Sequence, residues 1–579
     1  LRPGGREGRD RAARVPLPRR PPARSTVSNG ADHWNVASRL RETAQRCPDR
    51  LAVVCAAGRD GTGGARWQRL TFAELDGESD RVACGLERIG IGRGTRTVLM
   101  VPPGLDFFVA TFALFKVGAV LVLVDPGIGR RNLGVCLGEA EPAAFVGVPL
   151  AHAGRLAFGW ARASIRTVVT VGRRWGWGGP TLDELREGAG RAPQIAVVDR
   201  HETAGIFFTS GSTGVPKGVV YTHGIFAAQL EFLQEQFQPG DDDADLATFP
   251  PFALIDAVLG ATAVIPEMDA RRPASADPAR LVEAILAHHT TRMFGSPALI
   301  DRLARHCESR GIRLTSIRRV LTAGAPVRGD IVERMSAVLP PDAEFHTPYG
   351  ATEALPVTSI ESREILTETR AASARGAGVC VGRPIRQVRV RVIRVTDEPI
   401  AAWSDDLVVP DGTIGEIVVE GAIVTPAYHA RAASNALGKI RKADGGIVHR
   451  MGDVGWLDPG GRLWFCGRKA HRVETASGTL WPDPCEGIVN EHPAVFRSAL
   501  VGVGPPGAQE PIICLELERR AGRAERARIA SEVLALCAAH EPMRAIRRVL
   551  FHRAFPVDRR HNAKIDRPAL ARWAARRLG

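Results

Sequence analysis

The 579-residue sequence predicts an α/β protein with largely parallel sheets, followed by an antiparallel β module and a smaller α+β unit. Two observations predict this organisation. Short β-rich runs alternate with helix-like segments along most of the chain, and closely spaced strands joined by turns follow. The composition, with 45% hydrophobic and 24% charged residues, is that of an ordinary globular protein and excludes a disordered or fibrous class.

The parallel-sheet part is predicted from the alternation of the two kinds of segment. Short runs of Val, Leu, Ile and Phe are typical of buried strands, and the longer segments between them predict the helices that cover such sheets. The expected strands are residues 97–101, 120–124, 167–171, 206–208 and 319–322, and the expected helices are residues 72–89, 279–288 and 297–305.

The pattern changes near residue 388. Two close strands joined by turns rich in Pro and Asp, residues 388–395 and 414–419, predict antiparallel pairing. The smaller unit is predicted from strands at 498–503 and 512–517 and a helix over 526–539. We therefore expect three parts, which are a disordered basic tail over residues 1–33, a large domain over 34–467 and a small domain over 468–579.

The net charge of +14 suggests an anionic partner, but the choice of basic residues argues against nucleic acid. Interfaces with phosphate backbones normally use both lysine and arginine, and only six of the 77 basic residues are lysines. Because arginine could replace lysine wherever only a charge is needed, each lysine is informative. The lysines are Lys116, Lys217, Lys439, Lys442, Lys469 and Lys564.

Cysteine usage and hydropathy predict a cytoplasmic protein without a transmembrane segment. The ten cysteines form no C-x-x-C pair, which favours free thiols in a reducing compartment. No secretory signal peptide is recognisable. The most apolar stretch, residues 107–124, contains Thr111, Lys116 and Gly118, and we expect it to form a buried helix followed by a buried strand.

One loop has the composition of a polyphosphate site. It combines glycines, hydroxyls and a lysine, which supply unhindered backbone N–H groups, extra donors and one mobile ammonium. It is not a Walker A loop, because Gly218 follows the lysine and strands are expected on both sides. The alternative is a flexible Gly/Ser hairpin loop. The residues are Thr209, Ser210, Gly211, Ser212, Thr213, Gly214, Val215, Pro216, Lys217 and Gly218.

This loop resembles the phosphate-binding signature of the adenylate-forming superfamily, which includes acyl-CoA ligases, peptide-synthetase adenylation domains and luciferases. Further motifs follow in the order of that family and extend the resemblance over the whole chain except its basic tail. They are Ala323-Gly324-Ala325-Pro326, Tyr349-Gly350-Ala351-Thr352-Glu353, Gly415-Glu416-Ile417, Met451-Gly452-Asp453-Val454-Gly455, Gly467-Arg468-Lys469 and Asn562-Ala563-Lys564-Ile565. The resemblance implies a β-barrel-like subdomain within the large domain and a C-terminal lid.

The resemblance also implies roles for individual residues. Glu353 would hold Mg²⁺ and Thr352 would contact phosphate, whereas alone they could be a polar turn. Lys564 would reach from the lid and bridge the substrate carboxylate and the α-phosphate, stabilising the charge of the transition state. ATP would further be bound by Gly324, Ala325 and Pro326 beside the adenine, by Tyr349 stacked on it, and by Asp453 and Arg468 at the ribose.

The substrate pocket is expected to be apolar. Ala253 stands where amino-acid-activating relatives carry an aspartate for the substrate ammonium, and apolar runs surround it at residues 250–255 and 294–297. Ala470 occupies the hinge position that usually holds Asp or Lys. The amino-acid sequences of residues 249–254, 465–473 and 556–565 resemble those of a narrower group, the β-lactone synthetases of long-chain olefin biosynthesis.

The expected reaction is therefore ATP-dependent adenylation of a long-chain β-hydroxy acid, followed by attack of its own hydroxyl to give a β-lactone. A long-chain acyl-CoA or acyl-carrier ligase is the alternative, and only this would require coenzyme A. A nucleotide- or nucleic-acid-binding protein without activity is a third class. Pathway partners would be thiolase-like, reductase and decarboxylase-like proteins. A base for the hydroxyl is not identified, and His223, Asp256 and His471 are candidates by residue type alone.

Overall fold

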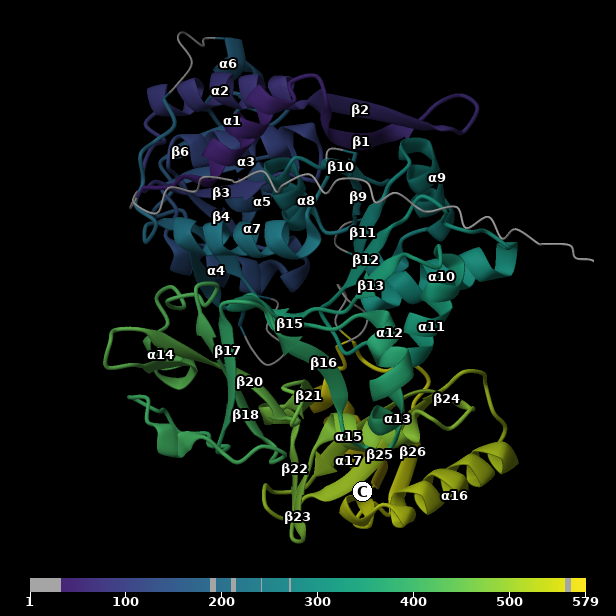
Figure 1. Cartoon of the computed structure of the whole chain (residues 1–579). Coiled ribbons are helices and arrows are strands. Elements are labelled where there is room, and N and C mark those ends of the chain that lie inside the picture. The colour runs from purple at the N-terminus through teal and green to yellow at the C-terminus, as the bar shows by residue number, and fades with distance from the viewer. Residues whose placement is uncertain are drawn as a thin grey trace, which may run out of the picture. The chain divides into compact units, whose positions relative to one another are not determined.

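The computed structural model describes residues 33–187, 194–209, 215–240, 242–269, 272–557 and 564–578. Residues 1–32, where the basic tail was predicted, lie outside this range. The contacts between Cα atoms make residues 33–579 one compact unit. Most of its helices and strands are labelled in Figure 1.

The first parallel sheet contains six strands in the order β6-β5-β3-β4-β7-β8. Every neighbouring pair is parallel except β7 and β8. The predicted strands are confirmed, and their ends differ from the predicted ones by at most three residues, because main-chain pairing rather than apolar composition fixes the boundary. The strands are β3 (Arg96–Met100), β4 (Val120–Leu123), β5 (Ala144–Gly147), β6 (Thr167–Thr170), β7 (Thr203–Phe208) and β8 (Gly218–Thr222).

Helices α2 (Phe72–Arg88) and α3 (Leu105–Lys116) carry much of the adjoining core. Thr71 and Glu74 form a capping box at the start of α2, which explains why this helix begins there. The apolar run 107–124 is the buried helix and strand that were predicted, with Lys116 paired to Asp76 and Asp80. Among the described residues, we find no helix of the length and hydropathy needed to cross a bilayer.

The second sheet contains seven strands in the order β13-β12-β11-β9-β10-β1-β2, all parallel except the pair β1 and β2. The strands are β1 (Leu51–Arg59), β2 (Ala65–Thr71), β9 (Ala244–Ala247), β10 (Thr262–Ile265), β11 (Arg292–Gly295), β12 (Arg319–Thr322) and β13 (Glu344–His346). Helices α8 (Pro250–Leu259), α9 (Pro278–His288), α10 (Pro297–Arg310) and α11 (Gly329–Val338) alternate with them.

Helix α10 is five residues longer at its C-terminal end than the predicted helix 297–305. Ser296 caps its N-terminus by accepting from the N–H of Leu299, and Gly311 ends it with a φ of +65°. A residue with a side chain is strained in that conformation, so the glycine rather than the apolar pattern marks the end.

The predicted antiparallel module is an eight-stranded sheet in the order β14-β15-β16-β21-β20-β18-β17, with β19 paired to β20. The two strands that indicated it are adjacent and antiparallel over Val388–Ile393 and Gly415–Gly421. The strands are β14 (Tyr349–Ala351), β15 (Ala354–Ser359), β16 (Val379–Pro384), β17 (Val388–Ile393), β18 (Gly415–Gly421), β19 (Lys439–Arg441), β20 (Ile447–Leu457) and β21 (Leu463–Arg468).

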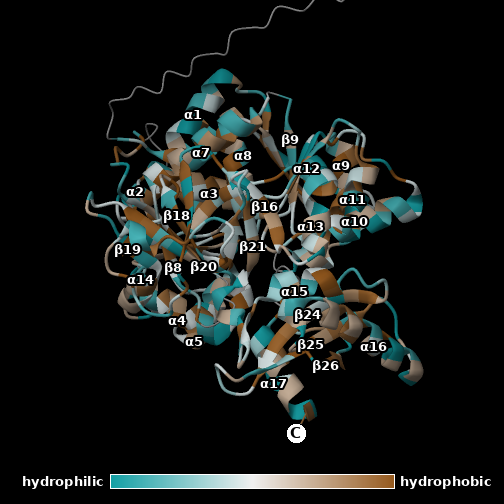
Figure 2. Ribbon diagram, turned by 60° about the horizontal axis from the view of Figure 1, so that its bottom comes forward, coloured by the Kyte–Doolittle hydropathy of each residue, from teal (hydrophilic) through white to brown (hydrophobic). Residues whose placement is uncertain are grey.

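The C-terminal part contains a two-stranded sheet and a three-stranded sheet with helices. Its apolar cluster joins the strands to α16, where Ile529, Val533 and Cys537 are buried at helical spacing. Hydrophilic and hydrophobic residues alternate along α16 in Figure 2. The elements are β22 (Val473–Thr475), β23 (Gly478–Leu480), α15 (Pro482–Val489), β24 (Val495–Val503), β25 (Glu510–Leu517), α16 (Arg523–Ala539), β26 (Arg548–Phe551) and α17 (Arg567–Leu578).

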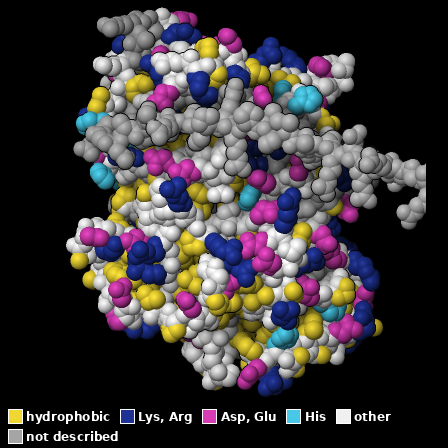
Figure 3. All heavy atoms as spheres, in the orientation of Figure 1, with side chains coloured by type: hydrophobic (Ala, Val, Ile, Leu, Met, Phe, Trp, Pro, Cys, Tyr) yellow, Lys and Arg dark blue, Asp and Glu magenta, His cyan; other side chains and the backbone are white. Residues whose placement is uncertain are grey.

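Basic and acidic side chains are mixed on the surface. On the face shown in Figure 3, Lys and Arg side chains are interspersed with Asp and Glu side chains and form no continuous basic surface. Many arginines in the described residues are held in ion pairs, such as Arg59 with Glu267 and Glu283.

Candidate active site

The phosphate-site loop connects two strands, as the sequence predicted, and these strands pair antiparallel. Strand β7 ends at Phe208 and β8 begins at Gly218. The N–H of Thr209 donates to the main-chain oxygen of Lys217 at 3.0 Å, so the ladder continues to both ends of the loop. Residues 210–214, which include the predicted contacts Ser210, Gly211, Ser212, Thr213 and Gly214, lie outside the described part of the chain.

Strand β8 brings the loop to the turn that carries Thr352 and Glu353. The hydroxyl of Tyr221, on β8, donates to the main-chain oxygen of Thr352 at 2.8 Å. On its other edge β8 pairs with a later segment, because Val219 forms a bridge with Tyr428. The ammonium nitrogen of Lys217 lies 4.8 Å from the centre of the Tyr428 ring. Three segments far apart in sequence therefore meet at Tyr428.

Tyr428 also holds the carboxylate of Glu353. Its hydroxyl donates to Oε1 of Glu353 at 2.8 Å, and the main-chain oxygen of Glu353 accepts from the N–H and the hydroxyl of Thr425. Within the described residues Oε2 of Glu353 has no hydrogen-bonding partner. Nor do these residues contain a cluster of three or more potential metal ligands. One available carboxylate fits Mg²⁺, which is usually bound by one or two carboxylates together with substrate phosphates.

The predicted ribose site is a buried group on two neighbouring strands. Asp453 on β20 is opposite Arg468 on β21, and Nε of Arg468 lies 3.0 Å from Oδ1 of Asp453. The hydroxyl of Tyr349 donates to Oδ2 at 2.6 Å. Burial raises the pKa of Asp453 above its ordinary value, and the charge of Arg468 opposes that shift.

Asp453 can accept a further hydrogen bond. The ion pair with Arg468 does not have hydrogen-bond geometry, so Oδ1 of Asp453 is buried without a hydrogen bond among the described residues. A buried carboxylate oxygen in that state is unfavourable unless a donor arrives. A ribose hydroxyl is such a donor, and the arrangement fits the predicted contact. The Tyr349 ring packs near Phe465, with ring centres 5.9 Å apart.

Lys564 lies on this side of the site. It directly precedes Ile565, which forms an antiparallel bridge with Val557, and α17 begins three residues later. Its positive charge, like that of Arg468, opposes the rise in the pKa of Asp453 that burial causes.

The residues expected beside the adenine form a turn directly after β12. Gly324 has a φ of +99°, a conformation in which glycine is favoured, and Ala325 and Pro326 follow it outside any strand or helix. Leu321 at the end of β12 packs in the same apolar cluster as Tyr349. The turn thus begins from a strand that borders the Tyr349 region.

The two apolar runs predicted to hold the acyl chain contact each other. Phe252 on α8 packs edge-on against Phe294 on β11, with ring centres 4.7 Å apart, and against Phe249 at 4.9 Å. Ala253 is fully buried, so the position that holds an aspartate in amino-acid-activating relatives lies in an apolar interior. These contacts suit a hydrocarbon chain and leave an ammonium group without a counter-charge from this position.

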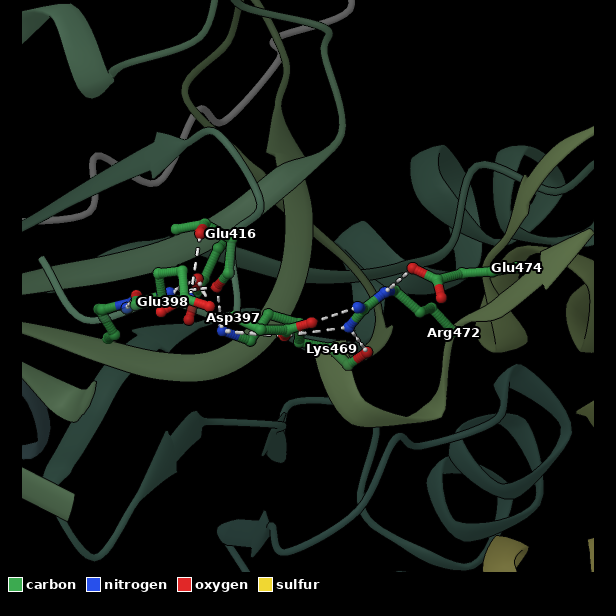
Figure 4. Close-up of polar contacts among 8 residues, drawn as sticks. Asp397, Glu398, Glu416, Lys469, Arg472 and Glu474 are labelled. Carbon is green, nitrogen blue, oxygen red and sulfur yellow. Dashed lines mark hydrogen bonds and ion pairs between the residues drawn. The ribbon is translucent and has the colours of Figure 1, made fainter. Parts of the chain in front are cut away.

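Lys469 and Arg472, on either side of the predicted hinge residue Ala470, belong to a network of ion pairs (Figure 4). Lys469 donates to Glu416 at 3.1 Å and to the main-chain oxygen of Thr396 at 2.7 Å. Arg472 forms a two-point pair with Asp397 and a further pair with Glu474 at 2.8 Å. Asp397 and Glu416 belong to the antiparallel module and Glu474 to β22, so Arg472 connects the two regions.

The three candidates for a base occupy different environments. His223 begins α7 (His223–Phe237), and burial lowers its pKa to about 4. Asp256 is buried on α8, and burial together with neighbouring Asp245 raises its pKa well above the ordinary range. Burial lowers the pKa of His471 to about 3. Among the described residues, no hydrogen bond or ion pair joins any of the three to Glu353 or Asp453.

Two residues of the site were not singled out as functional from the sequence, Tyr428 and Lys439. The ammonium of Lys439 donates to the main-chain oxygen of Thr425 at 2.6 Å and lies 5.6 Å from the centre of the Tyr428 ring. The rarity of lysine was a signal that could have indicated Lys439. No comparable signal marks Tyr428, except that the chain contains only three tyrosines.

Solved structures share this fold. An amide bond synthetase from Marinactinospora thermotolerans superposes with a TM-score of 0.74 at 23% identity, covering 93% of this chain and 99% of that chain. The O-succinylbenzoate coenzyme A synthetase of Bacillus subtilis, solved with ATP and a magnesium ion, gives a TM-score of 0.71 at 20% identity over 92% of this chain and 98% of that chain. At these identities the likeness concerns the fold.

Sequence relatives are more specific. The model of the AMP-binding enzyme family matches residues 40–429. The olefin β-lactone synthetase of Stenotrophomonas maltophilia is 51% identical over 94% of this chain and 98% of its own length, and that of Xanthomonas campestris pv. campestris is 50% identical over 93% and 97%. The chain therefore belongs to the AMP-binding enzyme family, whose members form adenylates from ATP, and within that family it resembles the olefin β-lactone synthetases.

Proposed function

We propose that this enzyme adenylates a long-chain β-hydroxy fatty acid with ATP and then closes it to a β-lactone, releasing pyrophosphate and AMP. The observation that carries the proposal is the identity of 50–51% to two olefin β-lactone synthetases over nearly the whole chain. The contact between Phe252 and Phe294 supports an apolar acyl site.

In the first step the substrate carboxylate attacks the α-phosphorus of ATP and pyrophosphate leaves. The loop between Thr209 and Lys217 supplies donors for the phosphates, and Thr352 adds a hydroxyl. Asp453 accepts from the ribose, assisted by Arg468, and Tyr349 with Gly324, Ala325 and Pro326 forms the adenine site. Lys564 stabilises the charge on the carboxylate and α-phosphate. Glu353 is the residue that would hold Mg²⁺, which neutralises phosphate charge when bound.

In the second step the β-hydroxyl oxygen forms a bond to the acyl carbon. The bond from that carbon to the adenylate oxygen breaks, AMP leaves with the electron pair, and the hydroxyl proton passes to solvent or to a base. The mixed anhydride supplies the free energy stored in the strained ring. Because the hydroxyl and the carbonyl belong to one molecule, holding the chain bent makes the step unimolecular.

The ion pairs around the hinge support a reaction in which the substrate's own hydroxyl, and no external thiol, accepts the acyl group. An enzyme that forms a thioester must rotate its C-terminal domain about the hinge to admit coenzyme A. Here the hinge position is Ala470, while Lys469 and Arg472 on either side are ion-paired to the antiparallel module. We infer that the domain boundary lies at this hinge, with the large domain ending near Gly467 and the lid beginning at Arg468.

Two wider expectations accompany this function. A β-hydroxy acid must be supplied by condensation and reduction, and loss of CO₂ from a β-lactone gives an olefin. We therefore propose thiolase-like, reductase and decarboxylase-like proteins as pathway partners. A cytoplasmic location is supported by the ten cysteines, all free and most of them buried.

The decisive experiment is mass spectrometry of products from purified enzyme, ATP, Mg²⁺ and a long-chain β-hydroxy acid, with and without coenzyme A. We expect the acid minus one water, the mass of the lactone, in both reactions, and none from a Lys564→Ala control. A thioester that forms only when coenzyme A is present would instead establish the alternative, a long-chain acyl-CoA ligase.

A further inference from the structure

Tyr428 is held rigidly where it meets Glu353. Its main-chain N–H donates to Oδ1 of Asn435 at 2.7 Å, and its main-chain oxygen accepts from Nδ2 of the same residue at 3.0 Å. Its neighbour His429 donates its N–H to Gly218 of β8 at 2.7 Å. The phenol therefore reaches Oε1 of Glu353 from a backbone that is fixed on both sides.

Lys439 is connected to Glu353 indirectly, through hydrogen bonds of Thr425. It lies at the start of β19 and is buried, with 8% of the residue exposed. Its ammonium donates to the oxygen of Thr425 at 2.6 Å and to the Thr425 hydroxyl oxygen at 3.1 Å. The N–H of Thr425 in turn donates to the main-chain oxygen of Glu353 at 2.9 Å. Lys439 thus fixes Thr425, and Thr425 fixes the backbone of Glu353.

Burying the polar groups of Tyr428 and Lys439 is energetically unfavourable. Burial lowers the pKa of Lys439 to about 7, and the charge of Glu353 opposes that shift. A buried phenol loses its hydration, and only the bond to Glu353 replaces it among the hydrogen bonds of the described residues. A phenylalanine and a methionine would fill the same space without this cost. The phenol and the ammonium at these two positions therefore indicate a function beyond filling space.

We propose that Tyr428 and Lys439 are positioning residues that fix the Glu353 carboxylate so that Oε2 can meet the divalent cation accompanying ATP. Tyr428 occupies Oε1 and thereby sets the rotamer of the side chain, while Lys439 acts on the backbone through Thr425. Neither touches ATP in this scheme. The inference rests on the proposed role of Glu353, and the experiment below separates the two.

The test measures binding of a non-hydrolysable analogue, α,β-methylene ATP, by calorimetry with and without Mg²⁺. The variants are Tyr428→Phe, Lys439→Met and Glu353→Gln. Lys442→Met is the matched control, because Lys442 is close in sequence and pairs with Glu420 and Asp444 outside the site. Thermal unfolding of each variant shows whether it folds as the wild type does.

We expect Mg²⁺ to tighten binding to the wild type and to Lys442→Met by the same factor. Tyr428→Phe should lose about tenfold of that gain, as expected for one hydrogen bond to a charged group, and Lys439→Met should lose part of it. Both should keep the affinity measured without Mg²⁺. In pyrophosphate release, raising Mg²⁺ should restore the rate of Tyr428→Phe, which a merely structural defect would not allow.

The outcomes distinguish the two hypotheses. If Glu353→Gln keeps the full gain from Mg²⁺, the role proposed for Glu353 is wrong. If Glu353→Gln loses the gain while Tyr428→Phe and Lys439→Met keep it, the carboxylate needs no positioning and the present inference is overturned. Should Tyr428→Phe fail to fold, the comparison of Lys439→Met with Lys442→Met decides.

Discussion

Asp453 and Arg468 face each other across β20 and β21, with Nε of the arginine 3.0 Å from Oδ1 of the aspartate. Tyr349 donates to Oδ2 of the same carboxylate, and the positive charge of Lys564 opposes the rise in its pKa. Residues from β14, β20 and β21 thus converge on one buried carboxylate. This convergence makes Asp453 the point at which nucleotide binding is most directly tested.

Asp453→Asn should weaken ATP binding more than it slows the chemical step. The amide can accept only one of the two ribose bonds and loses its ion pair with Arg468. We expect the KM for ATP to rise by at least about tenfold, with a smaller effect on kcat. Steady-state kinetics of pyrophosphate release at varied ATP check this. An unchanged KM for ATP would contradict the ribose assignment.

Lys564→Ala should slow adenylation on the order of 10²-fold or more, because it removes a positive charge aimed at the developing negative charge of the transition state. Glu353→Gln should have an effect of the same order. Pyrophosphate release in the presence of the β-hydroxy acid is the measurement. A near-normal rate in either variant would show that its proposed role is wrong.

Ala470→Asp should restore the residue usual at the hinge and with it a productive second orientation of the C-terminal domain. We expect a large gain in coenzyme A thioester formation, measured by mass spectrometry beside the lactone. The proposal is contradicted if the wild type already forms the thioester efficiently.

Asp397→Ala should loosen the hinge, because it removes the two-point pair with Arg472. Hydrogen exchange of the amides in residues 469–474 should become faster. Asp411→Ala, an exposed change in the same β module, is the matched control. Equal exchange in both variants would mean that the ion pair is solvated and does not restrain the hinge.

His223 should make stability depend on pH in weakly acidic solution. Its pKa is lowered by burial from 6.5 to about 4, with Glu202 opposing the shift. Between these values the unfolded chain binds a proton that the folded protein does not, so stability falls as pH falls from 6.5 to 4. The contribution is at most about 3 kcal/mol.

His223→Gln removes this titration. Its thermal unfolding should therefore vary less with pH between 4 and 6.5 than that of the wild type. A variant that keeps the full pH dependence would show that other groups are responsible.

The sequence predicts the fold class, which is confirmed, and most residues of the proposed site. Motifs such as the loop from Thr209 to Gly218 and the run ending at Glu353 depend on residues adjacent in the chain, so backbone conformation and side chains are specified together. The predicted strands on both sides of the loop and the antiparallel pairing of β17 with β18 followed from local patterns and are confirmed. The observed end of an element differs from the predicted end where a capping residue fixes it, as Gly311 fixes the end of α10.

Which side chains from distant parts of the sequence contact those motifs is visible only in the tertiary structure. Tyr428 is 75 residues from Glu353, and Asp397 is 75 residues from Arg472. Lys439 was conspicuous as one of six lysines, yet nothing local indicated that it would be buried against Thr425. Such contacts arise when separate sheets and segments pack together, and the hydropathy and turn signals of a sequence describe each segment without its neighbours.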